Sequence, residues 1–309
     1  MIRIEKLSKR FGDVRAVEGI SFEVRRGEIY GLLGPNGAGK TTTLAMLSGM
    51  LRPDGGKVLV DGVDPEVDPL RVKAKLGSVP QETAIYEELT ARENLRFWAG
   101  LHGLRGARLK EAVDATLEQV GLTGRADSRA KGYSGGMKRR LNLGLGLVHR
   151  PQVVLLDEPT VGIDPQARQR ILEVVRGVTA TGTTVVYTTH YLEEAERLCD
   201  RVGIIDHGKI IAEGTIEELE RMVGGDDVIT VRGSFDVEQV RRRLDGLDSA
   251  RVLAAENGRV VLGAPGGGAQ AVTLLSTLLD GQLDVEGVSI QPPGLNGLFL
   301  KLTGRELRD

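Results

Sequence analysis

Apolar residues along this chain fall into short runs, and the stretches between those runs have the spacing of helices. Continuous apolar runs at Ile29 to Leu33 and Val153 to Leu156 predict strands that are buried on both faces. Alternating apolar and polar residues at Ile2 to Ile4 and at Ile20 to Val24 predict half-buried strands. Buried strands that alternate with helices indicate an α/β fold, with a mainly parallel, doubly wound sheet and ligands at the carboxyl ends of its strands.

A helical insertion is expected inside this sheet domain, over about residues 90–150. Thr90 followed by Glu93 is a capping-box pattern that predicts the start of a helix, and a second helical pattern runs from about Leu109 to Val120. The stretch from Arg92 to Leu122 contains no strand pattern of its own. We therefore expect helices alone in this part of the chain.

The pattern changes near Gly224-Gly225, where short strands begin to alternate with helical stretches and a glycine-rich turn, Gly266 to Gly268. The strands expected there are Val228 to Val231, Arg259 to Leu262 and Val285 to Ile290. The sequence thus predicts a main domain over residues 1–223 and a small α+β accessory domain over residues 224–309.

The composition indicates a soluble globular protein and does not point to a particular binding partner. The chain has 309 residues, of which 27% are charged and 40% hydrophobic, and a formal net charge of -2, which is typical of a soluble globular protein. This balance gives no argument for nucleic acid. No apolar run reaches the roughly 18 residues that span a bilayer, and Met1 leads into a predicted strand rather than a signal peptide. The lone Cys199 fits a reducing cytosol, and we expect it to be a small buried residue at a helix end.

The segment Gly34-Pro35-Asn36-Gly37-Ala38-Gly39-Lys40-Thr41 matches the phosphate-loop pattern G-x-x-x-x-G-K-[ST] in full. Its glycines let backbone N–H groups point at phosphate oxygens, Lys40 adds a charge, and Thr41 offers a hydroxyl to Mg²⁺. The alternative is a chance glycine-rich turn. The position between a buried strand and a predicted helix, Lys40 to about Met50, favours nucleotide binding.

Asp157 and Glu158 follow the buried run Val153 to Leu156. Two carboxylates at the end of a buried strand are costly unless they meet a cation or a water-filled site. In phosphoryl transfer Asp157 suits Mg²⁺, and Glu158 suits the orientation or deprotonation of the attacking water. An exposed acidic end of a strand is the alternative interpretation.

Two further polar residues end predicted strands, and each is weak evidence alone. His190 follows the β-rich run Thr183 to Thr189, where a neutral imidazole could contact a γ-phosphate or its water. Gln81 follows Ser78-Val79-Pro80, and its side-chain oxygen could join a metal shell. A structural or merely exposed histidine is the commoner case.

The segment Tyr133-Ser134-Gly135-Gly136-Met137 opens another predicted helix. The free amides at that helix start, beside two residues without side chains, can approach a second phosphate closely. Ser134 is suited to cap the helix, or alternatively to donate its hydroxyl to the anion.

The same helix has one predicted apolar face, formed by Met137, Leu141, Leu145 and Val148. The basic run Lys138-Arg139-Arg140 is interpreted as a solvated helix face rather than as a binding patch.

Taken in order, these segments resemble the nucleotide-binding subunit of an ATP-binding cassette (ABC) transporter, a P-loop NTPase, over roughly Ile2 to Leu219. Gly34 to Thr41, with the adjoining Thr42, resembles the Walker A loop, and Tyr133 to Met137 the signature motif. Val153 to Asp157 resembles the Walker B motif, and Glu158 resembles the catalytic glutamate that follows it. Gln81 resembles the Q-loop glutamine, Val161 to Asp164 resembles the D-loop, and His190 resembles the switch histidine. Phe11 resembles the aromatic residue that this family places against adenine.

The Tyr and Met ends of the signature segment are similar to those of subunits that serve ABC-2 type exporters, including the daunorubicin-resistance and sodium-efflux groups. The tail Gly297 to Gly304 resembles the tail of those proteins. The family usually has acidic residues just before Phe299, where this chain has Leu295-Asn296-Gly297, so a regulatory role of the tail does not follow.

The resemblance implies ATP and Mg²⁺ as cofactors and an ATPase that drives export of a drug, lipid, polysaccharide or ion. It implies a second nucleotide-binding subunit, in a homodimer or alternatively a heterodimer, in which the signature of one chain closes over ATP held by the other. It also implies an ABC-2 type permease against the helical insertion, and a cytoplasmic location on the inner face of the cell membrane.

Two other classes of function are the alternatives. A soluble ABC ATPase that acts on nucleic acid or ribosomes typically carries tandem cassettes or long coiled-coil insertions, and the sequence has neither pattern. A nucleotide-gated binding module without turnover would commonly lack Glu158 or His190, both of which are present.

Overall fold

The computed structural model describes residues 2–223, 227–236, 238–239, 251–264, 276, 284–291 and 294–303. The chain divides into two compact units, Met1–Ile210 and Ile211–Asp309. Two features named from the sequence, the domain boundary at Gly224-Gly225 and the turn Gly266 to Gly268, lie outside the described residues. The predicted boundary therefore stays a prediction.

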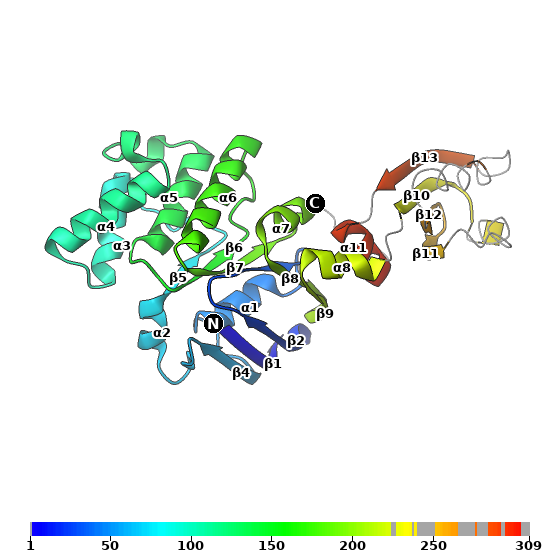
Figure 1. Ribbon diagram of the computed structural model, residues 1–309, viewed down its shortest axis with the longest axis horizontal. Coiled ribbons are helices and arrows are strands. Elements are labelled where there is room, and N and C mark those ends of the chain that lie inside the picture. The colour runs from blue at the N-terminus through cyan, green and yellow to red at the C-terminus, as the bar shows by residue number, and fades with distance from the viewer. Residues whose placement is uncertain are drawn as a thin grey trace. The chain divides into compact units, whose positions relative to one another are not determined.

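A six-stranded sheet forms the centre of the first unit, in the order β5-β6-β7-β3-β8-β9 (Figure 1). Its strands are β3 (Ile29–Leu33), β5 (Leu76–Val79), β6 (Val153–Asp157), β7 (Thr184–Thr189), β8 (Arg201–Asp206) and β9 (Lys209–Gly214), in which the unit ends. The pairs β5–β6, β6–β7, β7–β3 and β3–β8 are parallel, and β3, β6 and β7 are buried along their whole lengths. The predicted parallel α/β sheet is confirmed. The carboxyl ends of β5, β6, β7 and β3 therefore lie side by side at one edge.

A smaller antiparallel sheet has the order β2-β1-β4, with β1 (Ile2–Phe11), β2 (Val14–Val24) and β4 (Gly55–Val60). A hydrophobic cluster joins it to helix α1 (Lys40–Leu47) and to the central sheet through residues such as Ile4, Leu47 and Leu155. Strand β4 has no strong strand pattern in the sequence, because Val58 and Val60 are its only buried side chains, and it was not predicted. The short helix α2 (Pro69–Lys75) was not predicted either.

Helices α3 (Ala91–Leu101), α4 (Gly106–Gln119) and α5 (Gly135–Leu147) lie together as a group (Figure 1). The predicted capping box is confirmed, because the Glu93 amide donates to Thr90 Oγ1 at 3.1 Å and the Thr90 amide donates to the Glu93 carboxylate at 2.8 Å. Two 3-10 turns, η1 (Thr123–Arg125) and η2 (Ala130–Gly132), lead into α5. The helices share their own hydrophobic cluster, and the predicted apolar face of α5 contributes Leu141, Leu145, Val148 and the partly buried Met137.

Helices α6 (Pro165–Ala180) and α7 (Leu192–Leu198) follow β6 and β7. Cys199 caps the end of α7 and is buried, as predicted, and burial raises the pKa of its thiol. None of the described helices has both the length and the apolar composition that a membrane crossing requires.

The second unit is a small α+β unit that contains a four-stranded sheet, in the order β11-β12-β10-β13 with antiparallel pairs. Its elements are α8 (Ile216–Val223), β10 (Asp227–Ser234), β11 (Arg251–Glu256), β12 (Arg259–Ala264), β13 (Asp284–Gln291) and α11 (Leu295–Thr303). Val228, Val261 and Leu300 form its buried cluster, and Lys301 Nζ of α11 donates to the Met222 carbonyl of α8 at 2.7 Å. The three strands predicted in this part of the chain are confirmed.

Candidate nucleotide-binding site

The phosphate loop lies between β3 and α1, as the sequence predicts. Gly39 immediately precedes α1 with φ +107°, and a Cβ at this position would lie 2.3 Å from the Ala16 carbonyl oxygen. Glycine is therefore required here for both the backbone angle and the close approach. The first backbone N–H groups of α1 have no carbonyl acceptor within the helix, so they are available to a ligand at the loop.

The loop is one wall of a cavity of about 440 Å³ at the carboxyl edge of the sheet. The residues that line it are Phe11, Ala16, Asn36, Gly37, Gly39, Lys40, Thr41, Thr42, Gln81 and Glu158. The structure therefore brings nine of the residues singled out from the sequence into one cavity, and Ala16 was not singled out.

Three loop residues support the cavity without lining it. Lys40 Nζ donates to the carbonyl oxygens of Gly34 at 2.6 Å and Pro35 at 2.9 Å, and the buried Ala38 donates its amide to the Pro35 carbonyl at 3.2 Å. The loop thus folds around its own lysine and holds the ammonium group at the cavity.

Lys40 also forms a buried ion pair with Glu158, at 3.0 Å between Nζ and Oε1. The second oxygen of Glu158 lies 3.1 Å from His190 Nδ1. Because an ionised carboxylate only accepts hydrogen bonds, Nδ1 carries the proton in this contact. Lys40 at the start of α1, and Glu158 and His190 just beyond β6 and β7, therefore form one continuous chain of polar contacts.

Asp157 lies beside this chain at the end of β6, where its Oδ1 accepts from the Thr188 hydroxyl at 2.8 Å. The Glu158 amide donates to the same hydroxyl oxygen at 2.9 Å. Thr188 thus fixes both acidic residues to β7. The sequence analysis did not single out Thr188, which looks like any other residue of a β-rich run.

Arg139 of α5 is the clearest correction to the sequence analysis, which interpreted the run Lys138 to Arg140 as a solvated helix face. Arg139 is only 5% exposed and donates to main-chain carbonyls that include those of Glu158 and Pro159. Burial lowers the pKa of its guanidinium. The sequence gives no apolar signal for this face of α5, because Asn142 and Gly146, three and seven residues further along, are polar or lack a side chain although the structure buries both.

The Ser134 segment lies apart from the phosphate-loop cavity. Ser134 caps α5, because its Oγ accepts from the Met137 amide at 3.3 Å, which is the first of the two predicted roles. A Cβ on Gly136 would lie 2.5 Å from the Ala167 side chain of α6, whereas a Cβ on Gly135 would meet nothing within 4 Å. Only Gly135 therefore leaves open space at the helix start.

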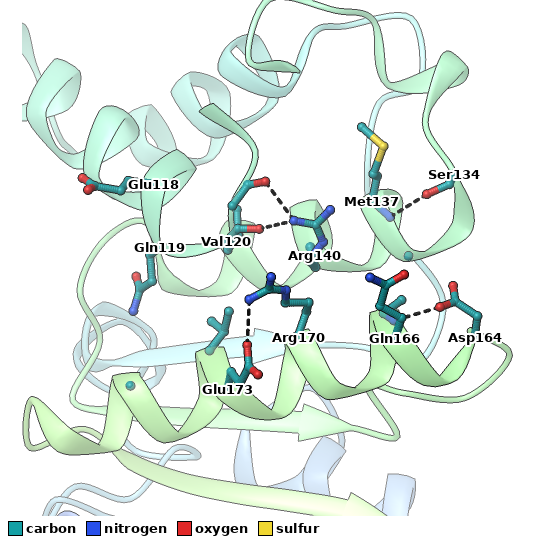
Figure 2. Close-up of a pocket in the computed structure, with 15 residues that line it drawn as sticks. Glu118, Gln119, Val120, Ser134, Met137, Arg140, Asp164, Gln166, Arg170 and Glu173 are labelled. Atoms are coloured by element: carbon teal, nitrogen blue, oxygen red, sulfur yellow. Dashed lines mark hydrogen bonds and ion pairs between the residues drawn. The ribbon is translucent and has the colours of Figure 1, made fainter. Parts of the chain in front are cut away.

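A second cavity, of about 710 Å³, opens beside this segment between α5, α6 and the end of α4. Figure 2 shows Ser134 and Met137 on one wall and Asp164, at the start of α6, on another. Asp164 caps α6 by accepting from the Ala167 amide at 2.9 Å. The D-loop segment thus lies next to the signature segment within one chain.

Comparison with known proteins extends these local observations to the whole chain. The family model described as ABC transporter matches residues 17–161. The chain is 44% identical to the linearmycin resistance ATP-binding protein of Bacillus subtilis (strain 168), over 100% of both chains. It is 38% identical to a daunorubicin resistance ATP-binding protein of Streptomyces coeruleorubidus, over 99% of this chain and 97% of that protein.

A solved structure described as the ATP binding subunit of an ABC transporter is 31% identical to this chain, with a TM-score of 0.66. The match covers 72% of this chain and 93% of the chain in that structure. The resemblance inferred from the sequence motifs is thereby confirmed. The chain belongs to the ABC transporter family and carries its ATPase domain.

Proposed function

We propose that this chain is the subunit that binds and hydrolyses ATP to drive an ABC-2 type membrane exporter. The observation that carries the proposal is the chain of contacts from Lys40 through Glu158 to His190 in the phosphate-loop cavity. Similarity over the full length to antibiotic resistance ATP-binding proteins supports the exporter part.

ATP binds with its phosphates on the loop amides and Lys40, and with its adenine against Phe11. The Phe11 ring lines the cavity and is 50% exposed, so it is available for stacking rather than part of the core. The Lys9 ammonium lies 5.7 Å from the ring centroid and adds a positive charge near this end of the cavity.

Glu158 acts as the general base, and His190 orients it. An arriving γ-phosphate competes with the Glu158 carboxylate for Lys40, which frees one carboxylate oxygen to accept a proton from water. The contact with His190 Nδ1 holds the other oxygen in place during this exchange.

Mg²⁺ would be held by oxygen atoms of Thr41, Gln81 and Asp157. Thr41 and Gln81 line the cavity, and hydroxyl, amide and carboxylate oxygens are the donors that this hard cation prefers. Among the described residues, no group of three or more His, Cys, Asp or Glu side chains could hold a metal ion. The proposed set of Thr41, Gln81 and Asp157 is of a different kind, because it contains only one carboxylate. When bound there, Mg²⁺ would supply positive charge that offsets the charge of the ATP phosphates.

The signature segment binds ATP that a second nucleotide-binding subunit holds. Among the described residues, none lines both the phosphate-loop cavity and the cavity beside Ser134. One chain therefore offers two separate anion-binding helix starts, and a head-to-tail pair would use both. Hydrolysis would then release the pair.

The surface proposed for the permease lies on the helical group. Tyr86 and Phe97 meet edge to face with ring centroids 5.2 Å apart, and they remain 48% and 43% exposed. Leu101, one turn further along α3, is also exposed. Exposed apolar side chains that lie together are typical of a protein contact. Tyr86 is only five residues beyond Gln81, which lines the ATP cavity, so one short segment joins this patch to the cavity.

A soluble ATPase that acts on nucleic acid or ribosomes is the alternative, and the resistance proteins that match the whole chain disfavour it. Co-purification of the full chain from cells tests the two. We expect a polytopic membrane protein to co-purify, and to lose its ATP-dependent transport in vesicles when Lys40 is replaced by Ala. Recovery of ribosomes or RNA in place of a membrane protein would contradict the exporter proposal.

A further inference from the structure

Arg139 is a buried cation whose hydrogen bonds go to the main chain beside the ATP cavity. Its guanidinium donates to four carbonyl oxygens, those of Pro80, Gln81, Glu158 and Pro159. The bond to Pro159 is 2.6 Å long, whereas the contact with Pro80 is 3.5 Å and weak. One side chain of the signature helix thus holds two chain segments that are far apart in sequence.

Those two segments carry the proposed metal ligand and the proposed base. Gln81 lies just beyond β5, and Glu158 lies just beyond β6, which is the neighbouring strand. Glu158 has φ +43°, in the left-handed region that non-glycine residues rarely adopt. A donor to its carbonyl therefore stabilises a turn that the local sequence does not favour.

Asn142, one turn further along α5, strengthens the same junction. Its Oδ1 accepts from the Ala84 amide at 2.8 Å, and its Nδ2 donates to the Pro80 carbonyl at 3.3 Å. Neither of these contacts reaches Glu158. Arg139 is thus the side chain of this pair that joins α5 to the acidic strand end.

The chemistry of the guanidinium suits this task. Its five N–H donors form a planar fork with fixed directions, whereas the three donors of a lysine ammonium rotate about the end of a flexible stem. Burial lowers the pKa of Arg139, and the nearby acidic groups Asp157 and Glu158 offset this in part.

We propose that Arg139 is a positioning residue for ATP hydrolysis, which ties the main chain of Gln81 and Glu158 to the signature helix. The position of α5 then sets where the Glu158 carboxylate points between Lys40 and His190. This inference rests on the proposed role of Glu158 as the base. It predicts that loss of the fork slows the chemical step and leaves nucleotide binding intact.

Arg92 of α3 supplies a control. Its side chain is also partly buried, and it pairs with Asp114 of α4 and with Asp127, at 2.8 Å between Nε and Oδ1 of Asp127. Arg92 lines neither the ATP cavity nor the cavity beside Ser134. Arg92→Met therefore removes a guanidinium that joins separate segments without touching either proposed ATP contact.

The test compares Arg139→Met, Arg139→Lys and Arg92→Met in the full chain, with kcat, KM and ATP affinity measured separately. For Arg139→Met we expect kcat to fall at least about tenfold while ATP affinity changes less than about twofold. Arg139→Lys should be intermediate, and Arg92→Met should keep kcat within about twofold of the unchanged protein. Added guanidinium, but not equal ionic strength from sodium chloride, should restore part of the activity of Arg139→Met.

If Arg139→Met does not fold, the test uses Arg139→Lys instead, for which kcat should fall while ATP affinity is kept. An Arg139 variant with unchanged kcat, or with parallel losses of kcat and affinity, would overturn the inference. Glu158→Gln distinguishes the two proposals. If that variant is inactive while Arg139→Met is normal, only the positioning role fails, whereas an active Glu158→Gln removes the proposed base itself.

Discussion

Lys40 Nζ and Glu158 Oε1 lie 3.0 Å apart, with their side chains only 4% and 6% exposed. This buried pair joins the phosphate loop after β3 to the acidic end of β6. Removal of one partner from such a pair leaves an uncompensated buried charge, which is more costly than removal of both. Nucleotide affinity and folding stability are therefore coupled at this contact.

Replacement of Lys40 by Ala should affect both properties. We expect ATP affinity to fall at least about tenfold, because the loss of one charge-assisted contact with phosphate is worth about 1.5–3 kcal/mol. We expect the free energy of unfolding to fall by about 3 kcal/mol, because Glu158 loses its cation. The double variant Lys40→Ala/Glu158→Gln should recover part of that stability in urea unfolding. Unchanged ATP affinity in the single variant would count against the phosphate-loop interpretation.

The two glycines of the signature segment should respond differently to alanine. Gly136→Ala places a Cβ 2.5 Å from Ala167 and should destabilise the protein by about 1–3 kcal/mol in chemical unfolding. Gly135→Ala meets no neighbour, so its stability should change by less than about 0.5 kcal/mol, while ATPase activity falls because the added methyl group obstructs the approaching phosphate. Wild-type turnover in Gly135→Ala would remove the close-approach role from Gly135.

Truncation tests the independence of the ATPase unit. A chain that ends after Gly224 should fold and bind ATP. It keeps α8 but loses α11, which contacts α8 in the second unit. A chain that ends after Gly214, at the end of β9, should fold at least as well, because it leaves no unpartnered α8. Circular dichroism and ATP titration measure the outcome, and failure of both truncated chains to fold would refute the predicted independence.

Protonation of His149 should destabilise the fold at mildly acidic pH. Burial, and secondarily the charge of His102, lowers the pKa of His149 from 6.5 to about 4. The unfolded chain then binds this proton at a higher pH than the folded chain does. Stability is therefore lost as the pH falls from about 6.5 toward 4, by on the order of 2 kcal/mol.

His149→Phe supplies the control, because a phenyl ring can preserve the stacking on His102, whose ring centroid lies 3.5 Å away. We expect the variant to lose less stability than the unchanged protein between pH 7 and pH 5, in urea unfolding at each pH. Parallel pH dependence in the two proteins would contradict a buried neutral His149.

Most of the ATP cavity was predictable from the sequence, because each part carries a local signature. The phosphate loop has a fixed glycine spacing, and Asp157-Glu158 follows a short apolar run that predicts a buried strand. The sequence alone gave only weak evidence for Gln81 and His190. The strand order strengthens both, because it places β5, which precedes Gln81, next to β6, and β7, which precedes His190, between β6 and β3. That order depends on pairing between distant segments and leaves no local pattern.

Arg139 shows where local reasoning fails. Its run of three basic residues is typical of a solvated surface, yet its acceptors at Gln81 and Glu158 lie 58 and 19 residues away in the sequence. Main-chain carbonyls are present at every residue, so no side-chain pattern identifies which of them a buried arginine will bind. The exposure of Phe11 likewise depends on tertiary position, because Phe11 lines the cavity and is half exposed, which its flanking residues do not indicate.

The most direct test of the central claim is single-turnover ATP hydrolysis by Glu158→Gln, combined with measurement of its molecular mass with and without ATP. The amide keeps the volume at the end of β6 but cannot accept the proton of the attacking water. The account predicts normal ATP binding, hydrolysis slowed at least about a hundredfold, and an ATP-dependent dimer that persists. A variant that hydrolyses ATP at the normal rate and stays monomeric with ATP would contradict it.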